Sequence, residues 1–217
     1  MKALGGRSAL LLDFLKTAFV TMLVTLDPPG LAPIFIGLTL GMTKAAQREV
    51  ALRATIIAFA ILAAFAFGGG AVMDLLGITI PAFRIAGGLL LFYIAFEMIF
   101  ELRSQRKQEL ASDAVTIDRI RNVAAFPLAI PIMSGPGSIT ATMLLAGRAG
   151  SDWQALTGLM AIIAVVMLLC YVTFLMAERV SRLLGTTGNL VLTRMLGVVL
   201  AALAVQFVIN GVLTVGK

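Results

Sequence analysis

The sequence predicts an all-α membrane protein with six transmembrane helices, arranged as two inverted three-helix repeats with broken first and fourth helices. Three observations predict this fold. The residues are 60% hydrophobic and 13% charged, whereas about a quarter of the residues in soluble domains are charged. Six long apolar runs follow one another along the 217 residues, and two sequence fragments recur in the same order. Such a chain leaves little room for an aqueous domain.

The apolar runs define the expected spans. Five of them carry no charge or a single one, Asp27 in the first: 17–42, 54–73, 122–147, 153–177 and 195–216. The remaining run, 78–100, contains Arg84 near its start and Glu97 near its end. Each run has at least the roughly 20 residues with which a helix crosses about 30 Å of hydrocarbon. We expect Arg84 and Glu97 to reach toward the membrane interfaces.

An internal duplication divides the spans into two groups of three. Residues 27–30 (DPPG) match residues 134–137 (SGPG), and residues 84–87 (RIAG) match residues 194–197 (RMLG). A unit with an odd number of spans inserts its second copy upside down, as in many secondary transporters. We therefore expect a first repeat at 1–102, a cytoplasmic linker loop at 103–121 and a second repeat at 122–217.

Basic residues set the expected orientation. With six spans, eleven Lys and Arg residues fall on the side of the linker and six on the side of the termini. The positive-inside rule then places both termini outside, in the periplasm or extracellular space. Because little in the linker looks able to pack, removal of Gln105 to Ala114 is expected to be tolerated.

The first and fourth spans contain six of the seven prolines. Proline removes an amide donor, and a freed backbone group in hydrocarbon costs several kcal/mol unless protein or water satisfies it. Both Pro-Gly breaks fall near the membrane midplane, where half-helix N-termini are suited to bind an anionic group and exposed carbonyls an ammonium. A small zwitterion suits this arrangement. The candidate substrate-binding residues are Asp27, Pro28, Pro29, Gly30, Ser134, Gly135, Pro136, Gly137, Ser138 and Thr140.

Asp27 is the costliest residue to place in the membrane, because a carboxylate there costs at least about 2.5–3.5 kcal/mol. Its roles remain open: proton carrier, ligand for a substrate ammonium, ligand for a coupling cation, or cap of the half-helix that starts at Pro28. The matching Ser134 carries no charge, so the two halves are not equivalent. Ser138 and Thr140 are able to bind a substrate or their own helix backbone.

The composition also argues against several function classes. With no histidine and one cysteine, Cys170, we expect no zinc, haem or other cofactor, and no enzyme. The net charge of +6 suits anionic lipid headgroups better than nucleic acid. The expected partners are therefore the lipid bilayer, a small-molecule substrate and possible further copies in a homo-oligomer.

Two signatures carry a family resemblance. Residues 27–35 (DPPGLAPIF) resemble the first signature of the MarC family, and residues 127–131 (PLAIP) with 134–139 (SGPGSI) resemble the second. Residues 84–91 (RIAGGLLL) resemble a third. The resemblance implies a six-span inner-membrane protein with outward termini. Members of the SnatA type transport small neutral amino acids such as glycine and alanine, coupled to the proton gradient.

The leading hypothesis is a secondary transporter of small neutral amino acids, proton-coupled and working outward. The alternatives are a passive channel or facilitator for small polar solutes, and a MarC-family membrane protein that does not transport amino acids. Concentration of substrate against its gradient separates a coupled carrier from a facilitator.

Overall fold

The computed structural model describes residues 2–114, 123–150 and 152–215, and these residues are almost entirely helical. Five of the described helices are long and apolar enough to cross a membrane, and the bent pair η1 and α6 is a sixth candidate span. The prediction of an all-helical membrane protein is confirmed. The helical segments are α1 Lys2–Leu26, α2 Pro28–Leu38, α3 Lys44–Leu75, α4 Ile80–Ile99, α5 Leu102–Ala114, η1 Ala124–Met133, α6 Pro136–Ala149, α7 Trp153–Leu175 and α8 Ala177–Val212.

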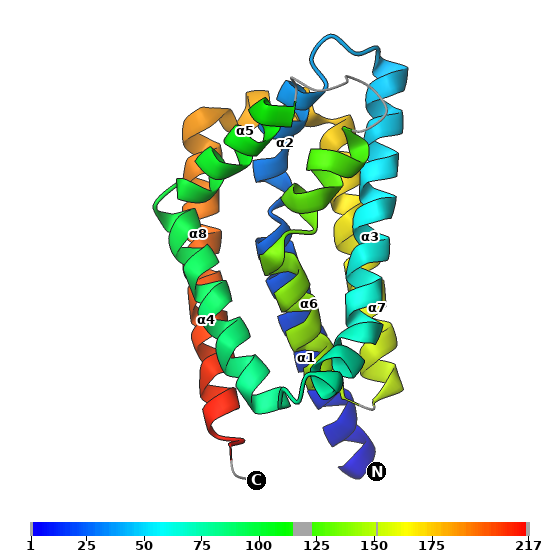
Figure 1. Cartoon of the computed structure of the whole chain (residues 1–217), viewed down its shortest axis with the longest axis vertical. Helices are drawn as coiled ribbons and strands as arrows, with labels where there is room; N and C mark the ends of the chain where they lie inside the picture. The colour runs from blue at the N-terminus through cyan, green and yellow to red at the C-terminus, as the bar shows by residue number, and fades with distance from the viewer. Residues whose placement is uncertain (1, 115–122, 151, 216–217) are drawn as a thin grey trace.

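The first and fourth spans are both interrupted. Asp27 separates α1 from α2, and the backbone of η1 is extended at Phe126 and Ile130. Between η1 and α6 the chain bends by 59°. Both interruptions lie near the middle of the long axis of the bundle (Figure 1). The prediction that these two helices are broken is confirmed.

The outer surface of the bundle is apolar. Large side chains remain exposed in the middle of the spans, among them Leu89, Phe92, Leu168 and Val198. A continuous apolar surface of this extent is costly in water and favourable against lipid tails.

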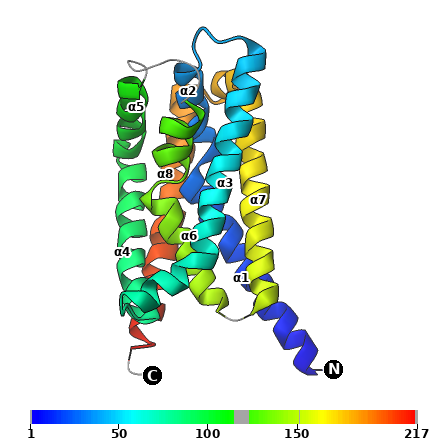
Figure 2. The ribbon, with the colours of Figure 1, turned by 45° about the vertical axis from the view of Figure 1, so that its right-hand side comes forward.

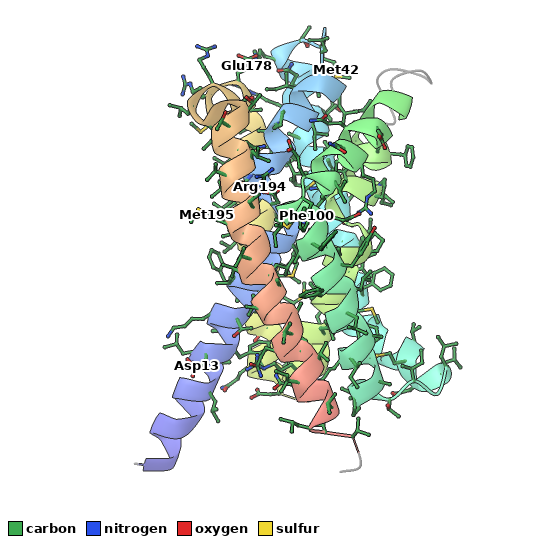
Figure 3. All side chains as sticks on the ribbon, turned by 90° about the vertical axis from the view of Figure 1, so that its left-hand side faces the viewer. Asp13, Met42, Phe100, Glu178, Arg194 and Met195 are labelled. Atoms are coloured by element: carbon green, nitrogen blue, oxygen red, sulfur yellow. The ribbon has the colours of Figure 1, made fainter. Side chains whose placement is uncertain are left out.

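Both termini lie at one end of the bundle (Figures 1 and 2), as an even number of crossings requires. Asp13 marks this end, whereas Met42 and Glu178 lie at the opposite end (Figure 3). We call the latter the α5 end, because α5 lies there beside α2.

The spans pair in a regular way. α4 packs along α8, α3 packs against η1 and α6, and α7 packs against α1 and α2. Glycines allow the closest pair to approach, since a Cβ on Gly88 would lie 2.8 Å from the carbonyl oxygen of Ala204. The rings of Phe35 and Phe174 stack with centroids 4.6 Å apart, which ties α2 to α7.

The linker differs from the expected loop. Residues 102–114 form α5, which contacts α2, α4 and η1, and its Arg103 and Lys107 side chains are buried. The reason is electrostatic: the basic face of α5 turns inward because Asp27 and Glu97 are buried beneath it. The remainder of the expected linker, residues 115–121, lies outside the described residues.

The sixth span also begins earlier than its apolar run. α8 starts at Ala177, directly after α7, and bends at Gly185, whose φ of +59° suits glycine. Arg194 therefore lies well inside a helix and not at its start. It approaches Glu101 at 3.8 Å, near the end of α4 (Figure 3).

Candidate functional site

At the first break, the backbone amides find their hydrogen-bond acceptors within the break itself. Asp27 adopts a left-handed conformation (φ 56°, ψ 63°), and its Oδ1 accepts a hydrogen bond from the Gly30 amide at 3.3 Å. Position 30 requires glycine, because a Cβ there would overlap Asp27 Oδ2 and lie 2.8 Å from Asp27 Cγ. The cap that the sequence allowed for Asp27 is therefore formed.

No amide at the start of α2 is left for a ligand. Pro28 and Pro29 have no N–H group. The Gly30 amide donates to the Asp27 carboxylate, and the Leu31 amide donates to the Asp27 carbonyl at 3.2 Å.

At the second break, in contrast, the first amides of the following helix have no cap. Gly135 precedes α6 in an extended conformation, and no side chain caps the helix. Pro136 has no amide, and within the described part of the chain no acceptor receives the amides of Gly137 or Ser138. These two N–H groups, together with the positive end of the helix dipole, are able to bind an anion.

The two breaks are neighbours. A Cβ on Gly137 would lie 3.6 Å from Thr25 Cγ2, next to the end of α1, and would overlap Ile94 of α4. Glycine at position 137 thus lets the start of α6 approach both helices closely.

A cavity of about 220 Å³ lies at the second break. Four candidate residues line it: Gly135, Pro136, Gly137 and Ser138. The rest of its wall comes from α4, α5 and η1, through Ile94, Arg103, Arg106, Lys107, Pro131 and Ile132.

The other candidate residues lie around this cavity and are not among those that line it. Asp27, Pro28 and Gly30 are buried at the first break, whereas Pro29 lines a separate cavity of about 140 Å³ next to α5 and α8. The Ser134 hydroxyl donates to the Ala58 carbonyl of α3 at 3.3 Å. The Thr140 methyl group faces Gly87 of α4.

Sequence reasoning missed the basic residues of α5. Arg103 donates to the Thr25 carbonyl at the end of α1 and to Met98 Sδ at 3.1 Å. Arg106 pairs with Glu97 at 2.7 Å. Lys107 Nζ is buried and has no hydrogen-bond partner among the described residues. The available signal was the spacing of 103, 106 and 107, which puts three cations on one helical face.

The prediction that Glu97 reaches toward the membrane interface is wrong. Its side chain is only 4% exposed and does not reach the interface. The reason is its pairing with Arg106, which supplies a counter-charge from within the protein. Its second carboxylate oxygen, Oε2, is buried and has no partner among the described residues.

Asp27, Arg103 and Lys107 interact electrostatically across the cavity region. Burial, and next the neighbouring Arg103 guanidinium, lower the pKa of the Lys107 ammonium from 10.5 to about 7, against the opposing effect of Asp27. The ammonium is therefore poorly compensated where it stands.

A larger cavity, of about 270 Å³, lies at the α5 end between α2 and the α7–α8 junction. The exposed ion pair between Lys44 and Glu178, at 2.6 Å, belongs to its wall. Phe35, also in that wall, is eight residues or about 12 Å along α2 from Asp27. The cavity of about 220 Å³ at the second break is therefore the candidate site.

Comparison with known proteins agrees with this architecture. Residues 12–215 match the model of the "MarC family integral membrane protein". The chain is 35% identical to a "UPF0056 membrane protein" of Archaeoglobus fulgidus, with 92% of each chain covered. It is 37% identical to the UPF0056 membrane protein MJ1677 of Methanocaldococcus jannaschii, over 93% of this chain and 97% of that one.

A bacterial relative is similar to this chain to about the same extent. The chain is 36% identical to the UPF0056 membrane protein YhcE of Escherichia coli, with 89% of each chain covered. No solved structure matches. The family match over nearly the whole chain and the similarity to these membrane proteins place the chain in the MarC family of integral membrane proteins.

Proposed function

We propose that this chain is a secondary transporter of small neutral amino acids, of the size of glycine or alanine, and that it is coupled to protons. The observation that carries the proposal is the cavity at the second break, midway along the spans. Irregular backbone at membrane depth is tolerated where it lines such a cavity.

The chemistry of the cavity supports a zwitterionic cargo. The free amides of Gly137 and Ser138 suit a carboxylate. The carbonyl groups at the end of α1 suit an ammonium, and in this structure the guanidinium of Arg103 already donates to one of them. The volume of about 220 Å³ is below the roughly 300–1,000 Å³ of pockets for drug-sized ligands. This favours a small solute.

The helix contacts support two inverted repeats that move relative to each other. α3 of the first repeat packs on the broken span of the second, and α7 of the second packs on the broken span of the first. α4 and α8, the last span of each, pack on each other. A two-fold axis in the membrane plane would produce this exchange, and rocking of one repeat against the other would give alternating access.

The location follows from the same proposal. We place the protein in the cell inner membrane with the α5 end in the cytoplasm and both termini outside. The excess of basic residues on the side of α5 supports this orientation.

Flux into proteoliposomes tests the function. With glycine or alanine inside and outside at equal concentration, an imposed pH step should drive net amino-acid movement. Exchange of labelled amino acid without net movement would favour the passive facilitator, and no flux of any neutral amino acid would remove the transport proposal.

The variant Asp27→Asn tests proton coupling without disturbing the fold. Asparagine keeps an Oδ1 acceptor for the Gly30 amide and tolerates the left-handed conformation, so the break is preserved. If Asp27 carries the proton, the variant should still exchange amino acid but no longer concentrate it. Uptake with unchanged pH dependence would exclude Asp27 from coupling.

A further inference from the structure

The charges beside the cavity do not balance. Three cations from α5, Arg103, Arg106 and Lys107, lie close to two buried carboxylates, Asp27 and Glu97. Among the described residues, one positive charge is left over in a place where burial of an unpaired charge is expensive. An anion in the cavity would compensate it.

Of these three cations, Lys107 is the one without a hydrogen-bond partner among the described residues. Arg103 donates to Thr25 and Met98, and Arg106 is paired with Glu97. The Lys107 side chain is buried, its ammonium makes no hydrogen bond with a described residue, and it lines the same cavity as Gly137 and Ser138. The ammonium and the free amides thus converge on one space.

We propose that the Lys107 ammonium, together with the Gly137 and Ser138 amides, binds the carboxylate of the transported molecule. This inference rests on the proposed transport function and names the residue of that site which recognises the anionic end. It makes α5, which lies outside both repeats, an integral part of the binding site.

Binding by this group depends on pH. Because burial lowers the pKa of Lys107 to about 7, a bound carboxylate stabilises the charged form, and binding takes up a proton. Affinity should fall as the pH rises above about 7, by up to tenfold per pH unit.

Within the described parts of the chain, few other titratable groups lie near Lys107. The break between α1 and α2 presents Asp27, α4 presents Glu97, α5 presents Arg103 and Arg106, and α7 presents the Cys170 thiol. η1 has no titratable residue. Arg103 and Arg106 stay charged over the working range of pH.

The test measures equilibrium binding of radiolabelled glycine to the purified full-length protein between pH 6 and 9. In Lys107→Met, which removes the charge but keeps an unbranched side chain, we expect at least tenfold weaker binding and no pH dependence. Lys107→Arg should bind glycine with a flat pH profile, because arginine does not lose its proton in this range. The matched control is Gln105→Met, an exposed position on the same helix, which should behave like the wild type.

Competing ligands identify the anion. Acetate, which has the carboxylate but no ammonium, should compete for the wild type and not for Lys107→Met. Ethylamine, which lacks the carboxylate, should bind both proteins alike. If chloride in place of methanesulfonate, an anion without a carboxylate, strengthens glycine binding and this effect disappears in Lys107→Met, the cavity holds an inorganic ion and the proposal is overturned.

The outcomes separate this inference from the transport proposal. Amino-acid flux in the wild type with unchanged affinity and pH profile in Lys107→Met would overturn the role of Lys107 and leave the transporter intact. Lys107-dependent binding of acetate, without binding of any amino acid, would support the carboxylate site and overturn the proposed cargo. Binding of neither ligand by the wild type would overturn both.

Discussion

Replacement of Gly30 by alanine tests how the first break is held together. A Cβ at this position would overlap the Asp27 carboxylate, whose Oδ1 accepts the Gly30 amide. The carboxylate must therefore move, and the buried amide loses its acceptor.

The magnitude follows from three contributions. An unsatisfied buried amide costs about 1–3 kcal/mol. Moving the Asp27 side chain off its rotamer costs about 0.5–1.5 kcal/mol. Alanine gains about 1 kcal/mol over glycine in a helix. The free energy of unfolding should fall by about 2 kcal/mol in Gly30→Ala.

The control lies in the same helix. Gly37 is exposed in α2, and no atom lies within 4 Å of the point that a Cβ on this residue would occupy. Gly37→Ala should therefore stabilise the protein slightly or leave it unchanged. Both variants can be measured by equilibrium unfolding with dodecyl sulfate in dodecyl maltoside micelles.

A double-variant cycle identifies the clash. In an Asp27→Ala background the carboxylate is absent, so adding Gly30→Ala should cost little. Were Gly30→Ala to destabilise that background as much as the wild type, or to be as stable as Gly37→Ala, the overlap with Asp27 would not be the cause.

Four further predictions concern packing and charge. Gly88→Ala should lower the free energy of unfolding by about 1–3 kcal/mol, because its Cβ would meet the Ala204 carbonyl of α8. In Gly70→Ala the Cβ enters open space, so this control should lose little stability in the same unfolding titration. Deletion of residues 105–114, although the sequence predicted tolerance, should destabilise the fold by at least about 1–3 kcal/mol, because Glu97 loses Arg106, and the yield of monodisperse protein should drop. Cys170, which is fully buried, should react with N-ethylmaleimide only after unfolding, as mass spectrometry would show. The pKa of the Lys107 ammonium is lowered from 10.5 to about 7 in the folded protein, so between these pH values the unfolded chain binds this proton and the folded protein does not. The free energy of unfolding of the wild type, measured relative to Lys107→Met, should therefore rise between about pH 7 and 10.5.

The sequence was sufficient for the spans and for the positions of the breaks. Length and hydropathy are set by the bilayer, and proline and glycine interrupt a helix through local geometry, so neither depends on distant residues. The cap at Asp27 was also predictable from the sequence, because an acidic residue directly before a helix is a common N-cap.

The missed features depend on contacts between distant segments. Arg103 and Lys107 are hydrophilic, and hydropathy alone placed them in an aqueous loop. Both basic side chains interact with the buried Asp27, which lies more than 70 residues earlier in the chain, and Arg103 also interacts with Glu97, six residues earlier on α4. Glu97 was assigned to the interface for the same reason, since its partner Arg106 belongs to the segment that was expected to be a loop.

The two breaks differ in whether the helix that follows is capped by a side chain. At the first break, the amides of Gly30 and Leu31 both donate to Asp27, and Pro28 and Pro29 have no amide. At the second, Ser134 donates its hydroxyl to the Ala58 carbonyl and Gly135 supplies no side chain, so the amides of Gly137 and Ser138 have no acceptor among the described residues. Residues 27–28 (DP) and 134–135 (SG) differ between the two breaks, and this difference accompanies the closed helix end at the first break and the open one at the second. The buried cations of α5 lie on the open side, where an anionic cargo would complete the missing hydrogen bonds and the missing charge together.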